Sequence, residues 1–234
     1  MVKLFIPMVM GWGLKWESGK NFTLKPIPVN SPLNNFHYFA THLKLNMHKY
    51  LFIDRDGTLL QTPPPGGQID SFEKLHFHPH VITWLGKIAR ELSFKLVMVT
   101  NQNGLNSLMY PTEFFYPTQN FMLEVFKNED IIFHDIIVDE SLPEENSPLR
   151  KPRIGRMTKY LEDQTNDISN SFVIGDRLTD IQFAKNMGCK GIFINPENLR
   201  GQSELTDSIE ELRNNWVVLA THHWQEIYEF LSKQ

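Results

Sequence analysis

The sequence contains a single cysteine, Cys189, among its 234 residues. A single cysteine excludes a disulfide within the chain, and it also excludes a structural metal site built from several thiolates of this chain. Sparse cysteine use is typical of proteins of the reducing cytoplasm. We therefore expect a cytoplasmic protein.

Long apolar runs and a surplus of positive charge are also missing. The apolar segment over residues 4–10 is interrupted by Pro7, is too short to span a membrane, and lacks a small-residue cleavage site typical of a signal peptide. The formal net charge of -4 at pH 7 provides no broad positive field for duplex nucleic acid or an anionic membrane. The sequence thus predicts a small-molecule ligand, with no nucleic-acid partner and no membrane partner.

The remaining composition is that of an ordinary globular protein, with 41% hydrophobic residues, enough to bury one sizeable core. Residues 1–46 show no sustained periodicity, so we interpret them as an N-terminal extension of uncertain structure. Residues 47–200 are the predicted catalytic domain. Residues 201–234 are predicted to be a helical tail, with helices around 209–212 and 224–231, that would link to a further domain.

Short apolar runs, typical of strands buried on both faces of a parallel sheet, recur along the predicted domain. They occupy residues 50–53, 96–99, 136–138, 172–174 and 192–194. Between them lie amphipathic helical patterns, for example over 81–92 and 154–161. This alternation predicts an α/β fold, a three-layer Rossmann-like parallel sheet, whose ligands bind beyond the carboxyl ends of the strands.

The first predicted strand is followed by two acids, Asp54 and Asp56, and then by Gly57, which permits a tight turn. A carboxylate can attack phosphorus directly and form an acyl phosphate, which splits hydrolysis into two easier displacements. Asp54 suits this nucleophilic role. Asp56 suits that of the acid that protonates the leaving alkoxide and later accepts a proton from water.

The ends of the other strands supply the remaining groups. Asp176 offers an oxygen ligand for Mg²⁺, and Asp180, one helical turn later, could orient a lysine or a metal-bound water. Thr100 and Asn101 can donate hydrogen bonds to phosphoryl oxygens, and Lys151 adds positive charge. Together these groups predict phosphoryl chemistry assisted by a magnesium ion.

Each of these features has a simpler interpretation when taken alone. The Asp-x-Asp-Gly pattern also opens EF-hand calcium loops, but Leu59 and Pro65 stand where the glycine and the acid of such a loop belong. A single Thr-Asn, Lys-Pro or Gly-Asp is usually a turn or a cap. The alternating histidines at 76, 78 and 80 are more typical of a loop than of a metal site. No single motif indicates catalysis, but the combination of all of these motifs does.

The order of these motifs resembles that of the haloacid-dehalogenase superfamily. The similarity is closer to the histidinol-phosphatase family, often the amino-terminal half of a bifunctional enzyme of histidine biosynthesis. The sequence segments that show this similarity are residues 51–59, 72–75, 97–102, 150–152 and 173–182, within a stretch of roughly residues 48–195.

The resemblance implies a phosphatase that hydrolyses L-histidinol phosphate through an aspartyl phosphate. It implies that Asp54 is the nucleophile and Asp56 the proton donor, and that Asp54, Asp176 and the carbonyl of Asp56 bind Mg²⁺. It also implies a fused or associated imidazoleglycerol-phosphate dehydratase domain, so the chain is either a fragment or a stand-alone phosphatase. No long insertion follows the first or second motif, which predicts that there is no separate cap domain.

The chain departs from this family in two places. Many relatives carry a zinc loop of three cysteines and one histidine before the motif lysine, whereas the matching positions here are Asp139, Ser141, Ser147 and Leu149. No structural zinc is therefore expected. Relatives commonly have an acid after Thr-Asn-Gln, where this chain has Asn103.

Two other functions stay open. Another capless phosphatase, acting on a sugar bisphosphate or a nucleic-acid 3′-phosphate, would use the same groups, although the acidic balance disfavours nucleic acid. A non-catalytic module of the same fold is disfavoured because the acids and the lysine are intact. Gln68 and Asp70 are candidates to meet an imidazole or ammonium group of the substrate.

Overall fold

The computed structural model describes residues 12–17, 21–26, 47–63 and 67–234, in two compact units, residues 1–47 and residues 48–234. In the first unit, β1 (Trp12–Glu17) and β2 (Asn21–Pro26) form an antiparallel pair. The sequence pattern had indicated neither strand. The rest of the predicted extension over 1–46 lies outside the described residues.

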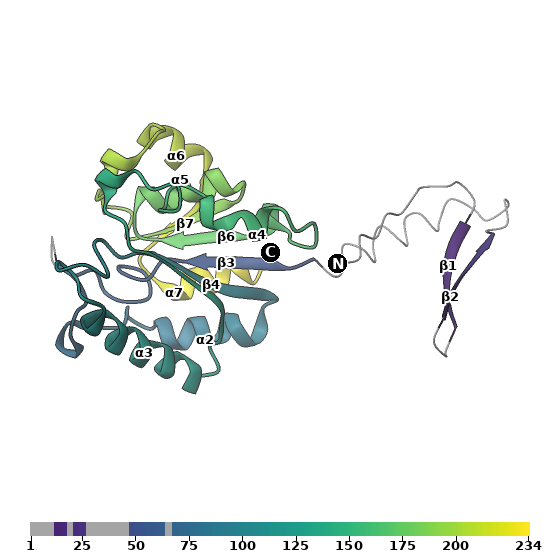
Figure 1. Cartoon of the computed structure of the whole chain (residues 1–234), viewed down its shortest axis with the longest axis horizontal. Helices are drawn as coiled ribbons and strands as arrows, with labels where there is room; N and C mark the ends of the chain where they lie inside the picture. The colour runs from purple at the N-terminus through teal and green to yellow at the C-terminus, as the bar shows by residue number, and fades with distance from the viewer. Residues whose placement is uncertain (1–11, 18–20, 27–46, 64–66) are drawn as a thin grey trace. The chain divides into compact units, whose positions relative to one another are not determined.

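The second unit is built on a six-stranded sheet in the order β5-β4-β3-β6-β7-β8, with every neighbouring pair parallel. The strands are β3 (Lys49–Ile53), β4 (Phe94–Asn101), β5 (Phe133–Asp139), β6 (Phe172–Gly175), β7 (Lys190–Ile194) and β8 (Val217–Thr221). The predicted α/β fold with a parallel sheet is confirmed (Figure 1).

Helices cover both faces of this sheet. They are α2 (Val81–Glu91), α3 (Thr112–Asn128), α4 (Thr158–Leu161), α5 (Leu178–Met187), α6 (Ile209–Asn215) and α7 (Trp224–Leu231). Short 3₁₀ helices occupy Phe72–Lys74, Pro143–Glu145, Gly155–Met157, Ile168–Asn170 and Gln202–Glu204. Figure 1 shows α2 and α3 on one side of the sheet and α5 and α6 on the other. Among the described residues, no helix is both long and apolar enough to cross a membrane.

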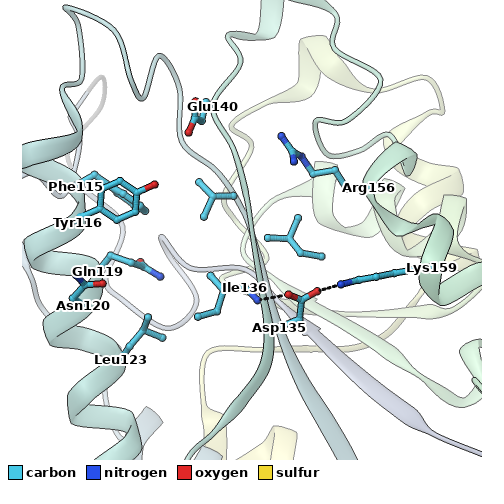
Figure 2. A pocket seen from close by; sticks show the side chains of 12 residues that line it. Phe115, Tyr116, Gln119, Asn120, Leu123, Asp135, Ile136, Glu140, Arg156 and Lys159 are labelled. Carbon is cyan, nitrogen blue, oxygen red and sulfur yellow. Dashed lines mark hydrogen bonds and ion pairs between the residues drawn. The ribbon is translucent and has the colours of Figure 1, made fainter.

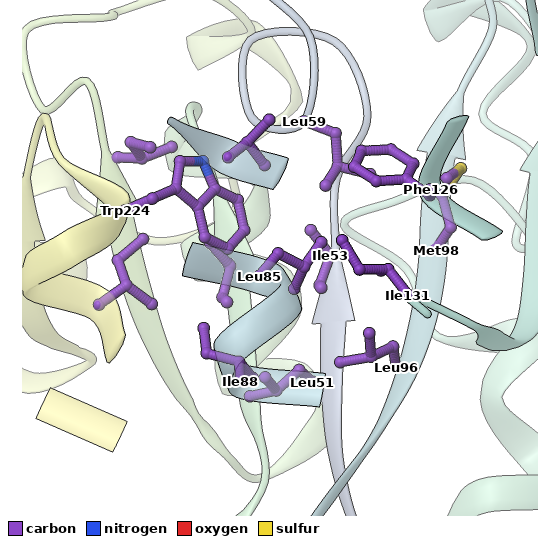
Figure 3. Close-up of a cluster of buried hydrophobic side chains, with 14 of the residues drawn as sticks. Leu51, Ile53, Leu59, Leu85, Ile88, Leu96, Met98, Phe126, Ile131 and Trp224 are labelled. Carbon is purple, nitrogen blue, oxygen red and sulfur yellow. The ribbon is translucent and has the colours of Figure 1, made fainter. Parts of the chain in front are cut away.

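The central strand β3 is buried on both faces because its side chains alternate between two cores. Leu51 and Ile53 pack with residues of α2, α3 and α7, as Figure 3 shows. Tyr50 and Phe52 pack on the opposite face with residues of α4 and α5. This burial fixes the end of β3, and hence the start of the loop that carries Asp54.

The two segments in which a cap domain would be inserted contain little regular secondary structure among their described residues. Between β3 and α2 the described residues contain one 3₁₀ helix, Phe72–Lys74, and between β4 and α3 they form a loop. This agrees with the expectation that no separate cap domain covers the site.

Residues 201–234 are not the separate helical tail that the sequence predicted. The two expected helices are present as α6 and α7, but β8 lies between them and pairs with β7. Trp224 of α7 is buried, and its indole Nε1–H donates to the carbonyl of Thr58 at 3.1 Å. The predicted boundary after residue 200 is therefore wrong, because this segment completes the sheet and one core. The run Trp216-Val217-Val218-Leu219 is the sequence signal for β8.

We predict that Trp224→Ala destabilises the protein by about 3–5 kcal/mol, since it removes a buried aromatic side chain and leaves the Thr58 carbonyl without its donor. Urea denaturation measures the change in the free energy of unfolding. Val218→Ala, on an exposed position of β8, is the matched control and should cost less than about 1 kcal/mol. Equal effects of the two changes would contradict the placement of α7 in the core.

Candidate active site

The carboxyl ends of β3, β4 and β6 meet at one small, deep pocket. Its lining consists of Asp54, Asp56, Thr100, Asn101, Lys151, Arg177, Thr179 and Asp180. β3 pairs directly with both β4 and β6, so the loops that follow these strands lie side by side. Of the residues predicted for catalysis, phosphate binding or metal binding, all but one line this pocket, and the last, Asp176, lies beside Asp54 and Asp180.

At the centre of the pocket one ammonium group joins two carboxylates. Lys151 Nζ donates to Asp54 Oδ1 at 2.6 Å and to Asp180 Oδ1 at 2.8 Å. All three side chains are less than one tenth exposed. Burial opposes the charge of Lys151, but the two carboxylates outweigh it and raise the pKa of the ammonium group. Lys151 is therefore a fixed positive charge beside Asp54.

Asn101 holds the backbone of Lys151, and its donation to phosphoryl oxygens stays a prediction. Its amide Nδ2 donates to the carbonyl of Lys151 at 2.9 Å, and the backbone N–H of Lys151 donates to Asn101 Oδ1 at 3.1 Å. The side chain predicted to donate to phosphoryl oxygens is thus engaged in holding the lysine backbone. The Thr100 hydroxyl oxygen accepts a hydrogen bond from Gln102 Nε2 at 2.9 Å, so the hydroxyl proton is not used in this bond.

The Asp56 carboxyl group is held by two side chains that the sequence did not single out. Arg55, fully buried, donates to Asp56 Oδ1 at 2.6 Å, and Gln102 donates to Asp56 Oδ2 at 3.1 Å. The guanidinium of Arg55 also lies 5.1 Å from the ring centroid of Phe115. Only their positions in the sequence could have indicated this role. Arg55 stands between the two acids, and Gln102 follows the Thr-Asn pair.

Three carboxylates form a group that suits a metal ion. Oxygens of Asp54, Asp176 and Asp180 lie within 4.8 Å of one another. Asp176 Oδ2 accepts a hydrogen bond from Asn198, whereas its buried Oδ1 has no hydrogen-bond donor among the described residues. Burial, followed by the charges of Asp54 and Asp180, raises the pKa of Asp176 to about 8. A buried, oxygen-only set with excess negative charge fits Mg²⁺.

Two motif glycines are required by this packing. Gly57 has φ of +96°, and a Cβ atom there would overlap the Asp176 carboxylate. A Cβ atom at Gly175 would overlap the side chain of Asp180. The loop after β3 can therefore approach the loop after β6 because Gly57 lacks a side chain, and Asp180 can lie over the end of β6 because Gly175 lacks one.

A wider cavity of about 530 Å³ opens beside the small pocket and shares Asp56, Asn101 and Arg177 with it. Its other lining residues are Pro63, Gly67, Gln68, Asn103, Met109, Leu142 and Arg200. Gln68 lies where a substrate contact was predicted and donates to the carbonyl of Asn103 at 3.0 Å. Asp70, the other candidate for a substrate contact, is not among the lining residues of this cavity and pairs with Lys74 at 2.7 Å, so the structure adds no support for that role.

The loop predicted to lack zinc is organised by hydrogen bonds. Asp139 Oδ1 accepts from both the backbone N–H and the hydroxyl of Ser141, and its Oδ2 accepts from Arg156 Nε at 3.4 Å. The absence of structural zinc stays a prediction.

A hollow of about 680 Å³ at the sheet edge contains none of the predicted site residues. It lies between α3 and β5, and the pair of Asp135 with Lys159 stands on its far wall (Figure 2). The chemistry is therefore to be sought at the carboxyl ends of β3, β4 and β6.

Comparison with known proteins gives a consistent set of similarities. A family model described as HAD-hydrolase-like matches residues 148–218. The chain is 46% identical over 187 residues to the histidine biosynthesis bifunctional protein HisB of Bacteroides fragilis, covering 78% of this chain and 47% of that protein. Identity to HisB of Spirosoma linguale is 45% over 187 residues, covering 79% and 49%. The chain spans about half the length of these curated relatives.

Among solved structures, the chain is similar to D,D-heptose 1,7-bisphosphate phosphatase from B. bronchiseptica, in complex with magnesium and phosphate. The TM-score is 0.64 at 19% sequence identity, over 79% of this chain and 98% of the other. At this identity the likeness supports the fold alone.

The raised pKa of Asp176 predicts a pH-dependent response to Mg²⁺. A carboxyl group whose pKa is higher in the folded than in the unfolded protein favours folding while protonated, so this contribution is lost as the pH rises from about 4 through about 8. Bound Mg²⁺ should offset the loss. The rise in Tm caused by Mg²⁺ should therefore be larger at about pH 8 than at about pH 5.

Thermal denaturation in EDTA and in Mg²⁺ at both pH values measures this difference. Asp176→Asn, which has no charge to gain, should lose most of it, whereas Asp70→Asn should retain it. An identical Mg²⁺ response at the two pH values would show that Asp176 is not the group responsible.

Proposed function

Because the chain belongs to the haloacid-dehalogenase superfamily of hydrolases, we propose that it is a Mg²⁺-dependent phosphatase converting L-histidinol phosphate to L-histidinol and phosphate in histidine biosynthesis. The main structural support for phosphatase chemistry is the pairing of Lys151 with Asp54, beside Asp176 and Asp180. The identity of 46% to a histidine biosynthesis protein supports the choice of substrate.

Asp54 acts as the nucleophile in this proposal. Its carboxylate oxygen forms a bond to phosphorus as the bond from phosphorus to the substrate oxygen breaks, which yields an aspartyl phosphate and an alkoxide. Lys151, fixed at 2.6 Å from Asp54, offsets part of the negative charge that would repel a phosphate dianion. When bound by Asp54, Asp176 and the carbonyl of Asp56, Mg²⁺ supplies the remaining neutralisation of that charge.

Asp56 moves the protons. It gives a proton to the departing alkoxide, so histidinol leaves as the neutral alcohol. It then takes a proton from the water that attacks the aspartyl phosphate, which releases phosphate and restores Asp54. Arg55 and Gln102 hold both oxygens of Asp56, so the carboxyl group stays aimed at the shared wall of the two pockets.

Thr100 and Asn101 contribute unequally. The Thr100 hydroxyl, which accepts from Gln102, is free to donate its proton to a phosphoryl oxygen. Asn101 serves mainly by keeping Lys151 in place through its two backbone hydrogen bonds. Asp180 supports the site as second acceptor for Lys151 and as acceptor for the backbone N–H of Arg177 at 3.1 Å.

The matched relatives are about twice as long as the similar region and are named bifunctional. This supports a second activity that is fused to, or associated with, the phosphatase, and we propose the imidazoleglycerol-phosphate dehydratase domain for it. A biosynthetic role in the cytoplasm follows from the same proposal.

A second candidate substrate is favoured by two cations of the wider cavity. Arg177 and Arg200 both line it, and the guanidinium of Arg200 donates to the carbonyl of Pro63 at 3.2 Å. Among the described residues, no carboxylate lies within ion-pair distance of Arg200. A second anionic group on the substrate, as in a sugar bisphosphate, would find a partner there.

Asp54→Asn should lower kcat by more than ~10³-fold, because an amide neither attacks phosphorus nor binds Mg²⁺ comparably. EDTA should abolish turnover of the parental protein. Steady-state release of inorganic phosphate measures both effects, and Asp70→Asn, whose partner is the surface residue Lys74, is the matched control with parental kcat. Full turnover by the Asp54→Asn variant, or by the parental protein in EDTA, would rule out the mechanism.

A panel of histidinol phosphate, a sugar bisphosphate, a 3′-phosphorylated oligonucleotide and a simple alkyl phosphate should separate the candidate substrates. We expect histidinol phosphate to lead in kcat/KM by ~10²-fold over the alkyl phosphate, since a cavity that pairs polar substrate groups disfavours analogues lacking them. Arg200→Ala should impair a bisphosphate far more than histidinol phosphate. If histidinol phosphate ranks level with the alkyl phosphate, the substrate assignment falls and the phosphatase chemistry stands.

A further inference from the structure

The residue before the motif lysine is as deeply buried as the lysine itself. Arg150 is 1% exposed, although its guanidinium is permanently charged. Its Nε donates to Glu204 Oε2 at 2.7 Å and its Nη2 to Glu204 Oε1 at 3.3 Å. Its Nη1 donates to Asn103 Oδ1 at 2.9 Å and to the carbonyl of Ser141 at 2.8 Å. One side chain thus makes four hydrogen bonds.

These bonds connect three loops at the carboxyl edge of the sheet. Asn103 follows β4, Ser141 follows β5, and Glu204 ends the 3₁₀ helix Gln202–Glu204 that follows β7. Lys151 is the next residue in the chain after Arg150, so the position of the Arg150 backbone limits where Lys151 can place its ammonium group. Asn101 holds the Lys151 backbone from the other side.

The buried guanidinium of Arg150 requires a carboxylate partner, because burying an unpaired charge is strongly unfavourable. Within the described part of the chain, Glu204 is the carboxylate in ion-pair distance of Arg150. Asn103 also accepts from Arg150 but is neutral, and it stands where an acid is common in the family that the sequence resembles. The negative charge therefore comes from Glu204, in a segment outside every motif.

We infer that Glu204 is a positioning residue for the active site: by pairing with Arg150 it keeps the loop that carries Lys151 against Asp54 and Asp180. The inference rests on the proposed phosphatase function. Lys151 neutralises charge that grows at the phosphoryl group during reaction, so its displacement lowers kcat more than it raises KM.

The test compares Glu204→Gln with Asp207→Asn. Asp207, from the same segment, pairs with Lys185 and touches neither Arg150 nor the pocket, so its variant controls for a general loss of packing. With Mg²⁺, histidinol phosphate and p-nitrophenyl phosphate, Glu204→Gln should lower kcat about tenfold or more while KM changes less than about threefold. Asp207→Asn should retain the parental kcat.

Rescue gives the more specific readout. In the double variant Asn103→Asp with Glu204→Gln, the new carboxylate lies where Arg150 already donates a hydrogen bond at 2.9 Å, so kcat should return to within about threefold of the parental value. A role of Glu204 in stability alone would lower Tm without lowering kcat at a permissive temperature. Parental kcat in Glu204→Gln, or a double variant that regains Tm without regaining kcat, would overturn the inference.

Two further measurements keep the test decisive. If Glu204→Gln does not fold, Glu204→Asp shortens the side chain by one methylene and weakens its pairing with Arg150, and a variant with lowered Tm but parental kcat overturns the inference. If the parental protein hydrolyses neither substrate, the proposed function fails on its own. The side-chain ammonium resonance of Lys151 in a proton–nitrogen spectrum then decides: it should shift or broaden in Glu204→Gln and stay unchanged in Asp207→Asn, and an unchanged resonance in both refutes the role.

Discussion

Two buried carboxylates, those of Asp54 and Asp180, share the ammonium group of Lys151, and the arrangement of the surrounding chain follows from the need to bring these three charges together. Taking an ion out of water costs several kcal/mol unless partners replace the lost hydration. β3 and β6 are neighbours in the sheet, which sets the loops of Asp54 and Asp176 side by side. Asp180, in the first turn of α5, points back over Gly175, where any side chain would collide with it.

Lys151 reaches this pair from a loop without regular structure, so its placement depends on side-chain contacts. Asn101 is hydrogen-bonded to the Lys151 backbone on one side. On the other side, the preceding residue, Arg150, is hydrogen-bonded to the loops after β4, β5 and β7. A metal clip built from thiolates would tie the loop locally, between residues close in sequence. Here the contacts reach to Asn103 and Glu204 instead, which couples the lysine to segments distant in the chain.

The groups of the site could be predicted where a local pattern carries them. A short apolar run followed by Asp54 or Asp176 is a strand end with an acid, and parallel strands bring such ends to one edge. Contacts that depend on tertiary packing could not be predicted. Gln102 reaches Asp56 only because β3 and β4 are in register, and Asn101, although it lines the pocket, is hydrogen-bonded to the backbone of Lys151. β8 was missed because a run as short as residues 217–221 lies between two stronger helical patterns.

The charge balance of the pocket also supports the proposed dependence of the phosphatase reaction on a bound cation. Asp54, Asp176 and Asp180 bring three negative charges, and Lys151 compensates one of them. When all three acids are ionised, two negative charges remain at low dielectric, and burial together with the charges of Asp54 and Asp180 raises the pKa of Asp176 to about 8. A phosphate dianion approaching this set would meet strong repulsion, and a divalent cation removes it by balancing the remaining charge. Arg177, which lines both pockets and lies 3.9 Å from Asp176 Oδ1, adds positive charge where the two pockets meet. The excess of negative charge that disfavours the metal-free folded state thus supports the proposal that binding of the ester depends on the metal.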